Sequence, residues 1–196
     1  RGTEGFQVGS KIETTGLRGS QPCELILDRV RVPKDSLLGR EGEGFYVGVK
    51  TYDRGRIDVA AQGIGIAQAA YEAAVSYAQT RTSFETPLID FQQVQYKLAD
   101  MAIGLHTARL LTYWAASLKD QGKDFVKAAS IAKVTATETA EKLALLAMMI
   151  HGGYGVATEY PVERFLRDSQ IIKTYEGTND IQRLTIAKQL IRELKS

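Results

Sequence analysis

Cysteine and histidine are scarce in this chain of 196 residues. Cys23 is the one cysteine, so no disulfide can form within the chain, which suits a reducing compartment. The two histidines, His106 and His151, stand at no spacing from each other or from Cys23 that is typical of metal ligands. We therefore expect neither a disulfide-stapled domain nor a metal site.

A dominant charge and a long apolar run are also absent. The 25 basic and 23 acidic side chains are interspersed and leave a net charge of +2, so neither a nucleic-acid-binding nor a membrane-binding surface is indicated. No apolar run reaches the roughly 18 residues that a membrane-spanning helix requires. The content of 44% hydrophobic and 24% charged residues is ordinary for a soluble globular protein.

The first forty residues contain strands and turns. Residues 6–9 and 23–32 are β-like, the second segment ending at Pro33, and residues 16–22 form a loop between them. Two or three strands could not bury a core of their own, so residues 1–39 are expected to be the end of a larger β domain. The first four residues look like neither a natural beginning nor the start of a helix, and we expect a truncated protein.

A glycine-rich joint at residues 38–44 marks the predicted domain boundary, with residues 40–196 forming the second domain. The three glycines of this joint also suggest a phosphate-binding loop. No Gly-Lys-Ser or Gly-Lys-Thr follows them, which favours a hinge.

From residue 45 onward, apolar and small side chains repeat at helical spacing. The predicted helices span residues 45–79, from 90 or 91 to Gly122, 126–150, from Pro161 onward, and 181–194. Three long helices with short connections favour an all-α fold, an antiparallel helical bundle. The core-facing positions of these three helices are Ala60, Ile64, Ala67, Tyr71, Ala74, Ala78, Phe91, Val94, Leu98, Met101, Leu105, Ala108, Ala115, Ala132, Ala136, Ala140, Leu143, Ala147 and Ile150.

Small residues enter this prediction in two ways. Gly63 and Gly65 are expected to allow close packing between helices. A small-residue face on the third long helix is expected to let bundles associate into a dimer or tetramer. Its members are Ala128, Ala129, Ala132 and Ala136.

The segment Tyr175-Glu176-Gly177 precedes the last predicted helix. Thr178 is the predicted N-cap, and Asp180 would lie in the first turn, where a negative charge is favourable. Glu176 would then lie outside the helix, on a turn that Gly177 can bend, with its carboxylate free to be aimed into a cavity. On spacing alone, the commoner interpretation is that Glu176 is an acidic residue at a helix start with no further function.

A series of ordered segments over most of the chain matches the pattern of one family. They are residues 17–20, 32–34, 37–39, 53–57, 65–68, 95–102, 151–155, 159–164, 167–168, 175–178 and 181–184. Together they resemble the C-terminal half of the acyl-CoA dehydrogenase family, closest to its short-chain, butyryl-type branch. The resemblance implies the family's C-terminal helical domain, preceded by the end of its middle β domain.

The resemblance implies a flavin enzyme that desaturates an acyl-CoA thioester between its α and β carbons. Glu176 would be the general base that removes the α proton, while the β hydrogen leaves as hydride to FAD. An apolar pocket raises the basicity of such a carboxylate, and hydrogen-bond donors must hold the thioester oxygen, one of them in the family being the N–H of the base itself. Other branches place the base immediately before an arginine on the first long helix. Here Gly55 precedes Arg56, so Glu176 has no rival.

Two sets of binding residues also follow from the resemblance. The acyl-CoA site would include Asp53, Gly55, Arg56, Tyr175 and Gly177. The FAD site would include Arg81, Phe84, Gln92, Ile150, Gly152, Gly153, Thr178, Asn179 and Asp180, of which Arg81, Gln92 and the Gly152–Gly153 turn would reach the flavin of a neighbouring subunit in a tetramer. The chain departs from the family pattern at Glu85 and Met149.

Interpretations without a functional role stay open at this point for Asp53, Arg56 and His151. Asp53 and Arg56 could form an ion pair on the helix surface, since they are spaced i, i+3. His151 could be a loop histidine whose hydrogen bonds are satisfied locally.

Alternatives to the whole enzyme also stay open. Alone, the chain could be a non-catalytic helical oligomerisation module, and the complete protein could be an acyl-CoA oxidase. Otherwise the resemblance implies a homo-oligomer, an electron-transfer flavoprotein as electron acceptor, and a location in the cytoplasm or, in a eukaryote, the mitochondrial matrix.

Overall fold

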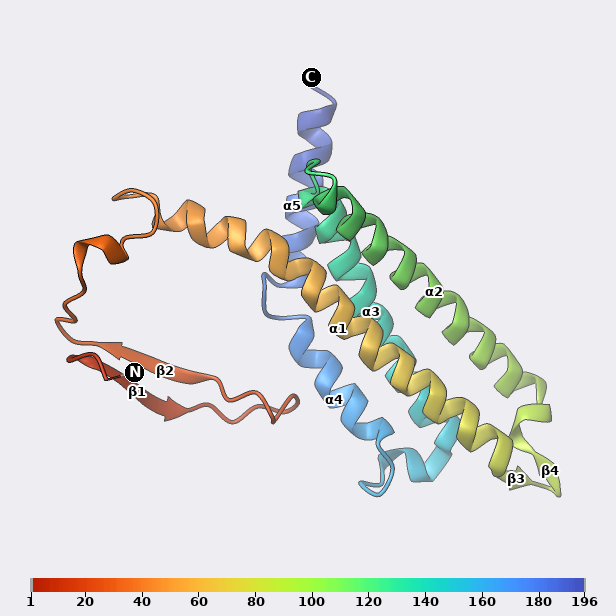
Figure 1. The fold of residues 1–196 in the computed structure, drawn as a ribbon. Helices are drawn as coiled ribbons and strands as arrows, with labels where there is room; N and C mark the ends of the chain where they lie inside the picture. The colour runs from red at the N-terminus through yellow and green to blue at the C-terminus, as the bar shows by residue number, and fades with distance from the viewer. Residues whose placement is uncertain (1, 196) are drawn as a thin grey trace.

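The computed structural model describes residues 2–195, and helices dominate them (Figure 1). Three long helices, α1 (Gly44–Thr80), α2 (Gln92–Asp120) and α3 (Val126–His151), lie side by side. Two shorter helices, α4 (Val162–Ile172) and α5 (Asn179–Glu193), also pack on α3, which is therefore the central helix. The predicted helical bundle is confirmed, and the predicted bounds of its helices agree with the structure to within about two residues.

Alanine dominates the interfaces of this bundle. The side chains of Ala67, Ala74 and Ala78 on α1 are fully buried, as are Ala136 and Ala140 on α3. A methyl side chain lets two helices approach closely, and the larger Met101 and Leu105 of α2 fill the space beside them. The core faces predicted for the three long helices are confirmed.

The small-residue face predicted to bind another subunit is wrong. Its members, Ala128, Ala129, Ala132 and Ala136, are at most 2% exposed and belong to the core of this chain. Three of them pack with Ala60 of α1 and Ala108 of α2. Small residues are needed here because α3 contacts every other long helix.

Gly63 and Gly65, both on α1, differ in what surrounds them. A Cβ atom at Gly63 would lie 2.9 Å from the backbone of Ala136, so this glycine permits the close approach of α1 and α3. A Cβ at Gly65 would meet nothing within 4 Å. The prediction of a packing role is confirmed for Gly63 and wrong for Gly65, which borders an open cavity.

A two-stranded antiparallel ribbon precedes the bundle. It consists of β1 (Phe6–Lys11) and β2 (Cys23–Leu27), with Phe6 opposite Leu27. The second strand was predicted to continue to Val32, but it ends at Leu27 because Arg29 takes a left-handed conformation, with φ of 50°. Large apolar side chains of the ribbon remain exposed, as expected for strands without a core of their own.

The connection from the ribbon to α1 contains the short 3-10 helix η1 (Lys34–Ser36) and two glycines with positive φ, Gly39 and Gly42. It has the irregular backbone expected of a hinge, and the domain boundary placed there stays a prediction. The first turns of α1 extend away from the other helices toward this connection (Figure 1).

The ribbon is tied to the bundle at the loop between its strands. The backbone N–H of Leu17 donates to Asp168 Oδ1 of α4 at 2.6 Å, and Arg167 Nη1 donates to the carbonyl of Thr15 at 3.0 Å. Gly16 lies against the backbone of Arg167, where a Cβ would have no room. This contact brings the loop next to α4 and α1, where it lines a cavity described below.

Two short elements complete the fold. A small hairpin of β3 (Thr82–Ser83) and β4 (Thr86–Pro87), followed by η2 (Leu88–Asp90), joins α1 to α2. The 3-10 helix η3 (Gly152–Val156) continues from the end of α3. Within residues 2–195, no helix is both long and apolar enough to cross a membrane.

Candidate active site

The turn between α4 and α5 holds Glu176 in an unusual conformation. Glu176 has a φ of 55° and Gly177 a φ of 86°, so two consecutive residues are left-handed. This region is costly for a residue with a Cβ atom and is found mainly where the surroundings enforce it. Thr178 then caps α5, its Oγ1 accepting a hydrogen bond from the Ile181 N–H at 3.3 Å, and Asp180 lies in the first turn. The position predicted for Glu176, outside the helix and before the cap, is confirmed.

The carboxylate of Glu176 points at α1. Its Oε2 atom is buried and has no hydrogen-bond partner within the described residues. A Cβ atom at Gly55 would lie 2.7 Å from the carboxyl carbon of Glu176, so the glycine leaves the space that the carboxylate occupies. Both residues line a cavity of about 540 Å³ together with Lys50, Thr51 and Arg54 of α1.

Arg56 and Asp53 form an ion pair beside this carboxylate. Arg56 Nη1 donates to Asp53 Oδ1 at 2.6 Å, and the two side chains are only 9% and 15% exposed, so the pair does not lie on the helix surface. Burial raises the pKa of Asp53 and lowers the pKa of Arg56, and in each case the charge of the partner opposes the shift. The negative charge of Glu176 also favours the charged form of Arg56 and so opposes the lowering of its pKa, which places the two groups within electrostatic reach.

Arg56 also carries an unused donor. Its Nε atom is buried without a hydrogen-bond partner in the described part of the chain, like Glu176 Oε2. Buried polar groups nearly always have a hydrogen-bond partner. An unpaired donor on Arg56 and an unpaired acceptor on Glu176, two residues close in space, therefore suggest that a ligand binds here.

Tyr175, the residue before Glu176, lines a different and more apolar cavity. This cavity measures about 920 Å³ and lies between α1, the end of α4 and the loop of the β ribbon. The Tyr175 hydroxyl donates to Gln62 Oε1 of α1. Burial raises the pKa of Tyr175, and the charge of Glu176 raises it further. The turn thus presents two successive side chains to two cavities.

The inner side of the turn is held by polar side chains that sequence reasoning missed. Lys133 of α3 donates from Nζ to the carbonyl of Gly177 at 3.0 Å, to the carbonyl of Lys173 at 3.1 Å and to Asn179 Oδ1 at 2.8 Å. Gln182 donates from Nε2 to the carbonyl of Glu176 at 3.2 Å and to that of Gly177 at 3.3 Å. Both side chains are completely buried. The available signal was Lys133 itself, a charged residue next to Ala132 on the alanine-rich face of α3.

Asn179 was predicted to bind the cofactor, but its side chain points into the bundle. Besides accepting from Lys133, it donates from Nδ2 to Thr137 Oγ1 at 3.0 Å and to Glu138 Oε1 at 3.3 Å. Its backbone N–H donates to the carbonyl of Lys173 at 3.1 Å. Thr178 and Asp180 are exposed beside it, so a ligand at this helix start would meet these two residues.

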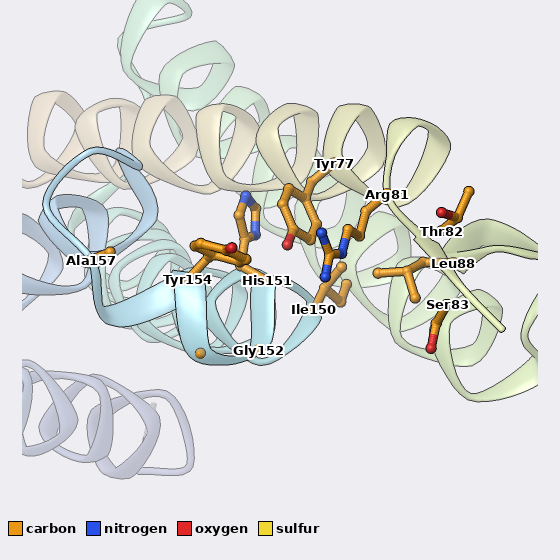
Figure 2. A pocket seen from close by; sticks show the side chains of 11 residues that line it. Tyr77, Arg81, Thr82, Ser83, Leu88, Ile150, His151, Gly152, Tyr154 and Ala157 are labelled. Carbon is orange, nitrogen blue, oxygen red and sulfur yellow. The ribbon is translucent and has the colours of Figure 1, made fainter. Parts of the chain in front are cut away.

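Several other predicted cofactor residues gather at the far end of α3 (Figure 2). Arg81, Ile150, Gly152 and Gly153 line one cavity of about 620 Å³. The Arg81 guanidinium lies over the ring of Tyr154, 5.6 Å from its centre. Gly152 has a φ of 59°, a conformation that glycine adopts readily. This cavity combines a cation, aromatic faces and exposed backbone.

Phe84 and Gln92 lie outside that cavity. Phe84 is at the tip of the small hairpin and is 93% exposed, and its φ of 48° and that of Glu85, 62°, form the turn. Gln92 begins α2 and lines an adjacent cavity of about 320 Å³, with Ser83 and Leu88 on its walls. Leu88 and Ser83 also line the Arg81 cavity, so the two spaces are neighbours.

His151 belongs to α3 and not to a loop, which corrects that part of the prediction. It is the last residue of the helix and is 4% exposed, with Nδ1 2.7 Å from the carbonyl of Ala147. Its ring stacks on that of Tyr77, with 4.0 Å between the ring centres (Figure 2). Burial lowers the pKa of His151, and the hydrogen bond to Ala147 opposes this effect.

The predicted site residues therefore fall into two groups. The turn of Glu176 is bonded to Lys133, whereas Ile150 follows Lys133 by 17 positions on α3, about 25 Å along the helix axis. Asp53, Gly55, Arg56, Tyr175, Gly177 and Thr178 lie with Glu176, and Arg81, Ile150, Gly152 and Gly153 lie at the other end. The two groups of predicted site residues are therefore well separated along α3.

Comparison with known proteins identifies the family. Residues 42–191 match the family model described as acyl-CoA dehydrogenase, C-terminal domain. The chain is 48% identical over 194 residues to the short-chain specific acyl-CoA dehydrogenase of human mitochondria, covering 99% of this chain and 47% of the relative. It is 49% identical over 191 residues to an acyl-CoA dehydrogenase of Bacillus subtilis, covering 97% and 50%.

A solved structure agrees with these relatives. Butyryl-CoA dehydrogenase from Megasphaera elsdenii superimposes with a TM-score of 0.96 at 45% identity, over 97% of this chain and 50% of that protein. The chain thus spans about half the length of the relatives that it matches. With the family model covering most of its residues, the chain belongs to the acyl-CoA dehydrogenase family.

Proposed function

We propose that this chain is the C-terminal part of a flavin-dependent acyl-CoA dehydrogenase in which Glu176 is the general base. The enzyme would convert a saturated acyl-CoA into its α,β-unsaturated product. One observation carries the proposal: a buried carboxylate oxygen that has no hydrogen-bond partner among residues 2–195, on a left-handed turn, facing the space that Gly55 leaves open. A residue that only decorated a helix start would have its carboxylate in water.

The role of Glu176 follows from this geometry. Its free oxygen would accept the α proton of the thioester as the α C–H bond breaks, and the electron pair of that bond would form the new double bond to the β carbon. The chemistry that a bound flavin supplies is acceptance of the β hydrogen with its electron pair. A carboxylate kept out of water does not have to shed a hydration shell before it reaches a carbon acid.

Glu176 can contribute a second group through its backbone. Within residues 2–195 its N–H donates no hydrogen bond, so it is free to hold the thioester oxygen as negative charge develops there. The left-handed turn would then present a base and an oxyanion donor from the same residue. This dual use explains why the turn is strained.

The other residues of this group bind and orient the acyl-CoA in the proposal. Arg56 has a free buried donor and a charge near Glu176, and Asp53 holds its guanidinium in place. Gly55 and Gly177 leave room at the reacting carbon, and Tyr175 walls the adjacent cavity.

The residues at the other end of α3 fit a flavin dinucleotide. Arg81 offers a guanidinium, which suits a pyrophosphate, beside the exposed backbone of Gly152 and Gly153. Ile150, Phe84 and Gln92 would complete this surface. Thr178 and Asp180, at the exposed start of α5, would hold the flavin that serves Glu176, since a helix N-terminus favours anionic groups.

Two separate flavin surfaces on one chain support a homo-oligomer, because each flavin would bridge two subunits. An exposed apolar face on α2 supports the same conclusion. Its members Ile103, Leu110 and Tyr113 are 65%, 69% and 65% exposed. We propose a dimer or tetramer assembled through this face.

The remaining assignments rest on the relatives. An electron-transfer flavoprotein is proposed as the acceptor of the electrons, and a solved structure described as an electron transferring flavoprotein of Acidaminococcus fermentans matches this chain at 43% identity with a TM-score of 0.96. Five mammalian relatives among those compared are named as mitochondrial. We propose the mitochondrial matrix in a eukaryote and the cytoplasm in a bacterium.

The test is made on the complete protein that contains this chain. The purified protein should carry a yellow flavin that is bleached by a short acyl-CoA under anaerobic conditions, and turnover should require an artificial electron acceptor. Turnover supported by oxygen alone would identify an oxidase. A protein that holds no flavin and reduces no acceptor would contradict the proposal and favour a non-catalytic helical module.

A further inference from the structure

Lys133 is a fully buried cation for which the proposed reaction has no use. It stands on α3 among small side chains, and burying a charge there is costly unless it is well paired. Its three hydrogen-bond acceptors are two backbone carbonyls and one amide oxygen, with no carboxylate among them. A cation in such a place is therefore dedicated to the backbone that it contacts.

That backbone is the turn that carries Glu176. Lys133 holds the carbonyls of Lys173 and Gly177, which stand on either side of Glu176. Gln182 holds the carbonyl of Glu176 itself and shares that of Gly177. The other end of Gln182 is fixed because its Oε1 accepts from Ser130 Oγ of α3 at 3.0 Å. Two buried side chains thus bind three carbonyls within five consecutive residues.

The strain at Glu176 shows what this arrangement achieves. A glutamate at φ of 55° returns to a right-handed conformation unless its neighbouring peptide groups are held. Residue 177 must be a glycine for a separate reason. A Cβ atom there would collide with the side-chain amide of Gln182. The carbonyls face the bundle interior, and the carboxylate faces α1 on the other side.

We propose that Lys133 and Gln182 are positioning residues that hold Glu176 in its left-handed conformation and so aim its carboxylate at the reacting carbon. The inference rests on the proposed function, because it assumes that Glu176 is the base. Neither residue touches the substrate. Their contribution is to the orientation of Glu176.

Charge gives Lys133 a second influence that Gln182 lacks. Burial and, to a smaller extent, the nearby charge of Arg56 lower the pKa of Lys133, the charges of Glu138 and Glu176 oppose the shift, and the net pKa is about 8. Lys133 and Glu176 therefore interact electrostatically, and Arg56 and Glu138 are the other charged groups that act on Lys133.

The test compares four variants of the complete flavoprotein. Lys133→Met keeps the length of the side chain but removes its charge and donors, and Gln182→Met removes the amide. Lys127→Met is the matched control, since Lys127 lies on the same helix and its ammonium pairs with Glu193 at the surface. Glu176→Gln removes the base itself.

Two rates separate positioning from other effects. The first is flavin reduction by a short acyl-CoA after rapid mixing. The second is deuterium uptake from heavy water at the α carbon of an acyl-CoA whose β carbon is replaced by sulfur, which reports proton abstraction without any hydride transfer. Dissociation constants for the same ligands show whether binding is intact.

Both positioning variants should lose roughly 10²-fold in both rates, as expected for a reacting group displaced by about 1 Å, with ligand binding within about threefold of wild type. Lys127→Met should match wild type in every readout.

Every outcome that differs from this expectation contradicts one specific claim. If Lys133→Met and Gln182→Met keep wild-type exchange rates while Glu176→Gln is inactive, the positioning role is wrong and the base assignment stands. If Glu176→Gln is active, the proposed function itself is wrong. If one positioning variant fails to fold with flavin, the other decides. If both fail, these residues serve folding and the positioning claim is overturned.

Discussion

Gly55 of α1 and Glu176 of the α4–α5 turn lie face to face, with room for no side chain between them. A Cβ atom added to Gly55 would come within 2.7 Å of the carboxyl carbon of Glu176. Residues far apart in sequence thus share one small space. The turn sets the position of the Glu176 backbone, and Gly55 leaves the space in which its carboxylate lies.

We predict that Gly55→Ala in the complete enzyme slows flavin reduction by short acyl-CoA by about 10–100-fold, because the methyl group pushes the carboxylate aside. Folding should not suffer, since alanine in a helix interior is favoured over glycine by about 1 kcal/mol. Rapid-mixing absorbance and thermal unfolding measure the two effects.

Gly48→Ala is the matched control on the same helix, because a Cβ at Gly48 would meet nothing within 4 Å. It should leave flavin reduction within about threefold of wild type. Equal rates for Gly55→Ala and Gly48→Ala would show that the contact with Glu176 does not constrain the carboxylate.

Gly63 and Gly65 allow a test of packing that is independent of catalysis. Gly63→Ala should lower the free energy of unfolding by about 1–3 kcal/mol, because the new methyl group overlaps the backbone of Ala136. Gly65→Ala faces open space and should raise it by up to about 1 kcal/mol through helix propensity. Urea titrations measure both values. A Gly63→Ala variant as stable as Gly65→Ala would mean that α1 and α3 can separate at little cost.

Local sequence signals predicted the helices but could not predict which neighbouring helix each face packs against. The N-cap at Thr178 and the apolar stripes at 3.6-residue spacing follow from interactions within a few residues, so the sequence was sufficient for them. Gly63 and Gly65 carry the same local signal, and only the position of α3 distinguishes them. The alanine face of α3 was assigned to a partner subunit for the same reason, since small residues do not say which helix they meet.

The candidate site shows the same division. The resemblance to a family led to the prediction that Glu176 is the base, and the structure confirms its place on the turn before the cap. Lys133 and Gln182 were missed because their role depends on hydrogen bonds to backbone carbonyls, 44 residues away in sequence for Lys133 and Gly177. Asn179 was assigned to the cofactor although its side chain points inward, because a motif does not specify the direction of a side chain.

His151 predicts a specific dependence of stability on pH. Burial holds its pKa below the ordinary value of 6.5, so in the window between these two values the unfolded chain binds a proton that the folded chain does not. Stability should therefore rise with pH through this window and be lost as the pH falls through it. Below the lowered pKa, both states are protonated and the contribution of His151 becomes constant.

The thermal midpoint measured between about pH 4.5 and 7.5, a range that spans the ordinary histidine pKa of about 6.5, tests this prediction. His151→Phe keeps a ring against Tyr77 but cannot titrate, so its midpoint should fall less than that of wild type on acidification. Identical slopes for wild type and His151→Phe would contradict the buried, neutral state assigned to His151.

The central claim is that Glu176 removes the α proton, and Glu176→Gln tests it most directly. Glutamine keeps the shape of the side chain and cannot act as the base, while Gly55 leaves no other carboxylate at this point on α1. In the complete enzyme the variant should bind flavin and acyl-CoA normally. Flavin reduction in a single turnover should fall by about 10²–10⁴-fold or more. A variant that reduces its flavin within about tenfold of the wild-type rate would contradict the account, because a missing base costs far more than that.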